Sequence, residues 1–141
     1  MEDAYLALAR SIEDRLASHM VKRFLEFHIV DLSRGRCVLS IDFKPDFDNT
    51  TGAIHGGILA MLADSAVACA LATEFGGEMN FVTSSLNIHF LRRASTAVTA
   101  TATVIKTGSR LCLGGAELHD AEGQLVATAT CDFALLQARD S

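Results

Sequence analysis

An almost uninterrupted apolar run over residues 55–75 (HGGILAMLADSAVACALATEF) is the feature that most limits what this chain can fold into. A helix that is apolar almost all the way round is expected to be buried on every side. The run is also about 20 residues long, the length of a membrane span. Asp64 lies in its middle, however, and the neighbouring segments have the patterns of soluble strands. We therefore predict a buried central helix and no membrane association.

The segments around this run predict strands joined by hairpins. Residues 3–22 are expected to form an N-terminal helix that packs on the domain, because apolar side chains recur at four-residue spacing. Two strands follow at 24–32 and 36–43, and then a loop at 44–54. Four further strands are expected near these ranges: 80–92, 96–107, 110–120 and 124–137. A helix as apolar as the central one needs a sheet curled around it, which predicts a single α+β domain over residues 1–141.

Charge and cysteine content exclude several classes of protein. The net charge is −5 and no basic run occurs, so nucleic acid is not an expected partner. Four cysteines stand far apart without a C-x-x-C pair, which predicts neither a metal site nor a disulfide framework. The N-terminus lacks the apolar stretch of a signal peptide. These features favour a protein of the reducing cytoplasm.

Asp64 is the residue of the central run that most suggests chemistry. Its neighbours one helical turn away are all apolar: Ala60, Met61, Val67 and Ala68. An unpaired buried carboxylate is costly, so such a group is usually paired, neutral or functional. Two interpretations are open: a carboxylate that reaches solvent or a buried hydrogen bond, or a catalytic group whose partner comes from another strand or subunit.

The start of the same run predicts a site for a developing negative charge. Gly56 and Gly57 open the helix directly after His55, which leaves backbone N–H groups uncovered at its positive end. Such groups suit the oxyanion that forms on an attacked carbonyl. The alternative is an ordinary glycine-rich helix start capped by His55. Asp64 lies about 12 Å further along the helix, so the two features could meet only between two antiparallel helices, as in a symmetric dimer.

The spacing of these residues resembles a known family. The pattern N-x-x-G-x-x-H-G-G over 49–57, followed by L-A-D over 62–64, is similar to that of PaaI-like (phenylacetate-pathway) thioesterases of the hotdog superfamily. Residues 82–94 resemble the third-strand segment of that family, and residues 108–110 and 120–127 resemble its late hairpins. The resemblance implies a hotdog fold, in which a curved antiparallel sheet of about five or six strands wraps one long helix.

The resemblance also implies an acyl-CoA thioesterase that works without a metal or cofactor as a homodimer; a dimer of dimers is expected, but the choice between dimer and tetramer stays open. Gly56 would donate its N–H to the thioester carbonyl, with help from Asn49, and Asp64 of the opposing subunit would act on water or attack directly. Thr83 falls where the family often has a residue that positions the water, although strand alternation leaves open whether Thr83 or Ser84 faces the carboxylate. The candidates for substrate binding are His55, Gly57, Ser84, Arg92, Gly108 and Arg110.

Other functions remain as alternatives. A hydratase of the same fold pairs an Asp and a His five residues apart, whereas Asp46 and Asp48 precede His55 by nine and seven residues. A non-catalytic acyl-CoA binding module would gain nothing from a buried acid. The G-x-S-x-G motif of serine hydrolases and the G-x-G-x-x-G motif of dinucleotide-binding proteins are both absent from the sequence. The sequence therefore favours a thioesterase but leaves its acyl group open, and with it the choice between general-base and covalent routes.

Overall fold

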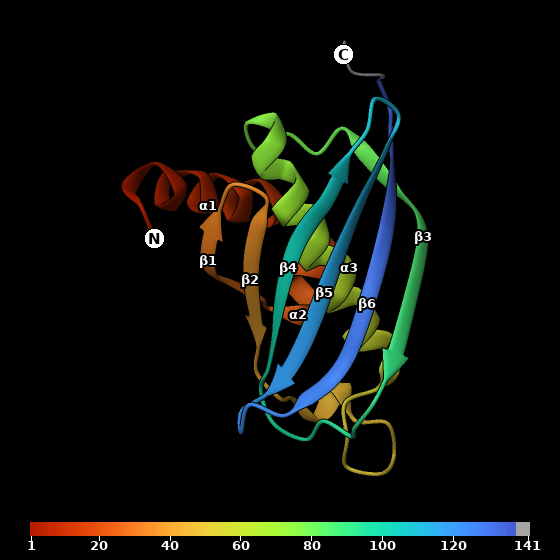
Figure 1. Cartoon of the computed structure of the whole chain (residues 1–141). Helices are drawn as coiled ribbons and strands as arrows, with labels where there is room; N and C mark the ends of the chain where they lie inside the picture. Colours follow the sequence, from red (N-terminus) through yellow and green to blue (C-terminus); the bar gives the residue numbers. More distant parts are fainter. Residues whose placement is uncertain (138–141) are drawn as a thin grey trace.

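The computed structural model describes residues 1–137, so the last four residues of the predicted domain lie outside the described part. The elements in chain order are α1 (Asp3–Leu16), α2 (Met20–Leu25), β1 (His28–Ser33), β2 (Arg36–Ile41), η1 (Pro45–Phe47), α3 (Gly56–Ala72), η2 (Thr73–Phe75), β3 (Phe81–Phe90), β4 (Val98–Thr107), β5 (Leu111–Asp120) and β6 (Leu125–Leu135). The strands form one antiparallel sheet in the order β1-β2-β4-β5-β6-β3. The sheet curves around α3, and β1 and β3 are its two edges (Figure 1). This is the α+β architecture that the sequence predicts.

The strands turn small apolar side chains toward α3. Along β4, Val98, Ala100 and Ala102 are buried, while the threonines between them lie on the outer face. Small side chains let the helix approach the sheet closely. At Gly114 of β5 a Cβ atom would lie 2.4 Å from Cγ1 of Val67, so only glycine fits opposite the helix.

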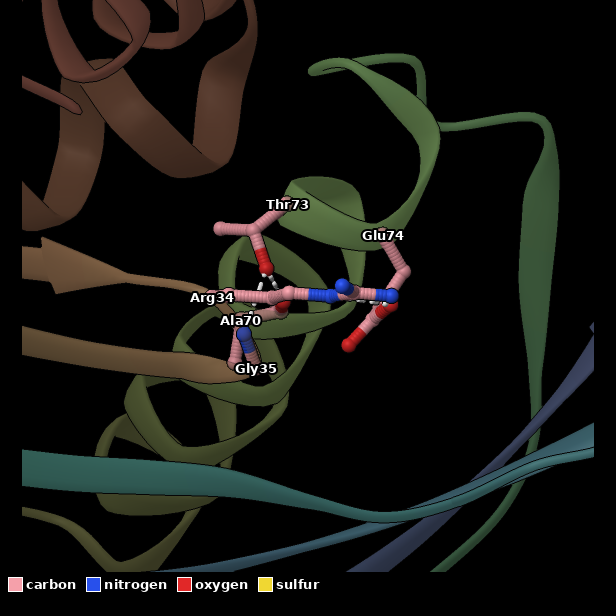
Figure 2. A network of polar contacts seen from close by, with 5 residues as sticks. All are labelled: Arg34, Gly35, Ala70, Thr73 and Glu74. Carbon is pink, nitrogen blue, oxygen red and sulfur yellow. Dashed lines mark hydrogen bonds and ion pairs between the residues drawn. The ribbon is translucent and has the colours of Figure 1, made fainter. Parts of the chain in front are cut away.

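The C-terminal end of α3 is fixed to the turn between β1 and β2 (Figure 2). The Thr73 hydroxyl donates to the Ala70 carbonyl and accepts from the Gly35 backbone N–H, both at 2.7 Å. Arg34 pairs with Glu74 at 3.3 Å in the same cluster. Gly35 has a φ of +71°, a conformation that favours glycine. The hairpin turn therefore holds the end of the central helix in place.

The central helix is not buried on every side, contrary to the expectation from its composition. Side chains on the sheet side, such as Leu62, Ala63 and Ala66, are fully buried. The face that carries Met61, Asp64 and Ala68 is only half-buried, because the sheet covers one side of the helix and α1 and α2 cover the other incompletely. The segment Gly56–Phe75 is long and apolar enough to cross a membrane, but half of it is packed inside the protein as the core helix.

The N-terminal segment also differs from the prediction. The single helix expected over 3–22 is two helices, and the second occupies the start of the strand expected at 24–32. Met20, one of the apolar residues at four-residue spacing on which the prediction of this helix depends, is 81% exposed. The chain turns here because Leu25 and Phe27 are drawn into the core, with Glu26 between them in the left-handed conformation that ends α2.

Candidate functional site

Asp64 finds its partner on the edge strand of its own chain. The Thr83 hydroxyl, on β3, donates a 2.7 Å hydrogen bond to Oδ1 of Asp64. The carboxylate is half-buried on the open face of α3. The contact leaves its second oxygen, Oδ2, without a hydrogen bond among the described residues. One carboxylate oxygen is therefore oriented and the other can accept a proton.

A β-bulge decides which residue of β3 faces the carboxylate. Thr83 pairs with Phe133, but the next pair is Ser85 with Asp132, so Ser84 is the extra residue. The Ser84 hydroxyl donates to the Asp132 backbone carbonyl at 3.2 Å instead. Strict alternation would place Thr83 and Ile88 on opposite faces, whereas the bulge puts both on the helix side. Of the two residues that the sequence left open, Thr83 contacts Asp64.

Asp64 and Thr83 line a cavity of about 370 Å³, a volume at the low end for small-molecule sites. Its walls are mainly apolar and come from α3, β3, β6 and the N-terminal helices. They include Leu16, Val21, Met61, Ala68, Phe81 and Phe133. A carboxylate with a positioned hydroxyl at the wall of an apolar cavity is suited to activating water beside an apolar ligand.

Cys131 lies on β6 close to this carboxylate and is completely buried. Burial first, and then the charges of Asp64 and Asp132, raise the pKa of its thiol to about 12. A thiol with so high a pKa stays protonated at neutral pH and is a poor nucleophile. Of the two neighbouring groups, Asp64 is therefore the better candidate for chemistry.

Asn49, Gly56 and Arg92 lie together in a second cavity of about 390 Å³. The side-chain oxygen of Asn49 accepts from the Thr51 hydroxyl at 2.6 Å and from the Thr51 backbone N–H at 3.0 Å. These contacts leave the amide NH₂ of Asn49 as a fixed donor. The ring of Phe90 closes on Gly56, where an added Cβ would lie 3.1 Å from it.

The start of α3 presents a free backbone donor. His55 is the N-cap, and its Nδ1 accepts from the Gly57 backbone N–H at 2.9 Å. The Gly56 N–H has no hydrogen-bond acceptor within residues 1–137. It lies at the positive end of the helix, which favours negative charge. Gly56 and Asn49 thus supply two donors that could hold a carbonyl oxygen.

The two groups of candidates do not meet within one chain. Asp64 and Thr83 line the first cavity, and Asn49, Gly56 and Arg92 line the second. The eight residues between Gly56 and Asp64 correspond to about 12 Å of helix, well beyond the reach of a single reacting carbonyl. The two groups therefore do not form one site within a single chain.

The other predicted substrate-binding residues lie apart. Gly108 and Arg110 line a third cavity of about 360 Å³ with Lys106 and Asp132. The sequence did not point to Asp132, whose carboxylate accepts a 2.9 Å hydrogen bond from Ser85. It also did not point to His19 and Lys22, which line the first cavity. No group of three His, Cys, Asp or Glu side chains suited to a metal occurs in the described part of the chain.

Comparisons with known proteins show which family and which solved folds this chain is similar to. A family model described as the thioesterase superfamily matches residues 51–127. A provisionally named esterase of Saccharolobus solfataricus is 29% identical over 140 residues, which cover 99% of this chain and 97% of that protein. The solved PaaI protein from the phenylacetic acid degradation operon of E. coli matches with a TM-score of 0.81 at 22% identity, covering 96% of this chain and 98% of that one. A mutant of the Thermus thermophilus PaaI protein matches with a TM-score of 0.73 at 29% identity, covering 82% and 97%.

Proposed function

Because the chain belongs to the thioesterase superfamily and has the hotdog fold of its PaaI relatives, we propose that it hydrolyses an acyl-CoA to a free acid and coenzyme A. The observation that carries this proposal is the Asp64–Thr83 pair at the wall of an apolar cavity. The cavity would hold the acyl group beside the carboxylate.

In the proposed reaction Asp64 acts on water. Oδ2 accepts a proton from a water molecule, whose oxygen attacks the thioester carbon. The carbonyl oxygen becomes an oxyanion, held by the N–H of Gly56 and the amide of Asn49 from a second copy. Collapse of this intermediate breaks the C–S bond, and coenzyme A leaves with a proton on its sulfur. Direct attack by Asp64 would pass instead through an anhydride that water then opens.

A second copy would pair along β3. This strand is an edge of the sheet, and an unpaired edge can add a strand from another chain. Val82, Leu86 and Phe90 of β3 are large apolar residues exposed in the single chain, at 49%, 37% and 51%. The site residues Thr83 and Phe90 lie on the same strand, so pairing there would bring Asp64 of one copy toward Gly56 of the other. The functional unit is then a homodimer, and a tetramer would be a pair of such dimers.

Coenzyme A would lie outside the acyl cavity. Arg92 lines the cavity that contains Gly56, and its guanidinium suits a phosphate. Arg110 and Lys106 make the Gly108 turn a further basic site. The four free, buried cysteines fit a reducing compartment, and we propose the cytoplasm.

The test is release of free thiol from short, medium and aryl acyl-CoAs by the wild type and by Asp64→Asn. The isosteric amide keeps an oxygen for Thr83 but cannot accept a proton from water, so we expect kcat to fall about 10²- to 10⁴-fold. Asp31→Asn is the matched control, because Asp31 is a paired carboxylate on β1, 2.8 Å from Arg36 and outside the acyl cavity. If the folded wild type binds acyl-CoA and releases no thiol, the protein is a binding module and not an enzyme.

A further inference from the structure

The acyl cavity contains a cation that hydrolysis of an unsubstituted acyl thioester does not need. Lys22 of α2 lines the cavity together with His19, on the wall formed by the N-terminal helices. Asp64 and Thr83 belong to the wall formed by α3 and β3. The remaining lining is mainly apolar, so a charged side chain here calls for an explanation.

Lys22 is held in place by contacts that leave its charge unpaired. Its ammonium donates to the Phe27 backbone carbonyl and lies 4.5 Å from the centroid of the Phe27 ring. An ammonium has three N–H donors, and the carbonyl takes one of them. No carboxylate within residues 1–137 forms an ion pair with Lys22.

Two carboxylates near Lys22 are engaged elsewhere. Glu26, just after α2, pairs with Lys44 at 3.0 Å. Glu13 of α1 accepts from the Ile29 backbone N–H at 2.7 Å. The fold therefore holds an ammonium against the cavity, and Asp64, the only carboxylate among the residues that line this cavity, forms no ion pair with it.

We infer that Lys22 binds a carboxylate at the far end of the acyl group, so that the preferred substrates are CoA monothioesters of short dicarboxylic acids. This inference rests on the proposed function and names its substrate class. The carboxylate replaces the missing counter-charge and forms a charge-assisted hydrogen bond with the ammonium. Asp64 repels the same carboxylate, which fixes the direction in which the acyl group enters. The volume of about 370 Å³ favours short chains.

Lys44 provides a matched control within the same chain. Its ammonium also donates to a backbone carbonyl, that of Phe24 at 3.2 Å, and lies over a ring, 5.2 Å from the Phe47 centroid. Lys44 differs in two respects: it is paired with Glu26, and it does not line the acyl cavity. If Lys22 had only a structural role, its substitution would change the substrate preference as little as substitution of Lys44.

The experiment compares adipoyl-CoA with hexanoyl-CoA, two thioesters of equal chain length. For the wild type we expect kcat/KM to favour adipoyl-CoA at least about tenfold, since a half-buried ammonium in an apolar cavity favours a ligand whose carboxylate can pair with it. Lys22→Met should abolish this ratio, Lys22→Arg should keep most of it, and Lys44→Met should leave it unchanged. A wild type that prefers hexanoyl-CoA, or a ratio unchanged in Lys22→Met, would overturn the inference.

Binding measurements distinguish a failure of this inference from a failure of the proposed function. Calorimetric titration of Asp64→Asn with both thioesters measures recognition without turnover, and the same titration of the Asp64→Asn, Lys22→Met double variant measures the role of Lys22. If the wild type cleaves neither thioester but binding still favours adipoyl-CoA through Lys22, hydrolysis is wrong and the ligand class stands. If the wild type cleaves both equally, hydrolysis stands and the ligand class is wrong. Thermal melting confirms that each variant is folded.

Discussion

The Thr83 hydroxyl donates a 2.7 Å hydrogen bond to Oδ1 of Asp64, and this contact joins the central helix to the edge strand of the sheet. It fixes the carboxylate in the wall of the first cavity, where α3 and β3 lie next to each other. In the proposed dimer the same edge strand would lie against the second copy. Orientation of the carboxylate and assembly of the site therefore depend on one strand.

Thr83→Val should lower activity without unfolding the protein. Valine has the shape of threonine but cannot donate a hydrogen bond, so Asp64 loses its orientation. We expect kcat to fall about tenfold to a hundredfold, the usual effect of losing a hydrogen bond to a charged group. Thr83→Ser keeps the hydroxyl and should retain most activity. Steady-state kinetics of the two variants test this, and equal activity of Val and Ser at this position would contradict it.

Asp64 could be found from the sequence, because a carboxylate among apolar neighbours on a central helix has few explanations. The alternation of Val98 and the following residues likewise predicted which face of β4 is buried. These features are local, and they depend on residue type and spacing alone. The outline of the fold and its most informative residue were therefore predictable.

Other features depend on contacts between distant segments. The bulge at Ser84 reverses the faces of β3, and it arises from pairing with Asp132 on β6. The break after α1 has no glycine or proline to mark it, and follows from burial of Leu25 and Phe27. Lys22 reaches the acyl cavity only because α2 forms there. Sequence periodicity does not contain this information.

Gly114→Ala should destabilise the protein far more than the same change at the next residue. A Cβ at Gly114 would lie 2.4 Å from Val67 Cγ1 and 3.1 Å from the Thr103 carbonyl oxygen, so the helix and sheet must separate. We expect a loss of about 1–3 kcal/mol in the free energy of unfolding. At Gly115 the nearest atom is the flexible end of Ile105 at 3.3 Å, and the loss should be below about 1 kcal/mol. Urea unfolding measures both, and equal losses would refute the close approach of α3.

Stability should fall in alkaline solution because of Cys131. Its folded pKa is raised to about 12 from an ordinary value of 9.0. Above pH 9 the unfolded thiol loses its proton while the folded thiol keeps it, so the unfolded state binds fewer protons and stability decreases until about pH 12. By pH 10 the loss from this thiol should be about 1 kcal/mol. Urea unfolding at pH 8 and pH 10 should show a smaller decrease for Cys131→Ala than for the wild type, whereas identical decreases would mean that the thiol is not shielded.

The proposed site between two copies of the chain can be tested most directly by mixing two inactive variants. Asp64→Asn removes the base and Asn49→Ala removes a donor, so each homodimer should be nearly inactive. A mixed dimer contains one site in which both residues are intact. After the subunits of an equal mixture exchange, about half of the dimers are mixed and each has one working site, so about a quarter of the wild-type thiol release should return. Activity that stays at the level of the separate variants, although subunit exchange is demonstrated, would contradict a site built from two copies of the chain.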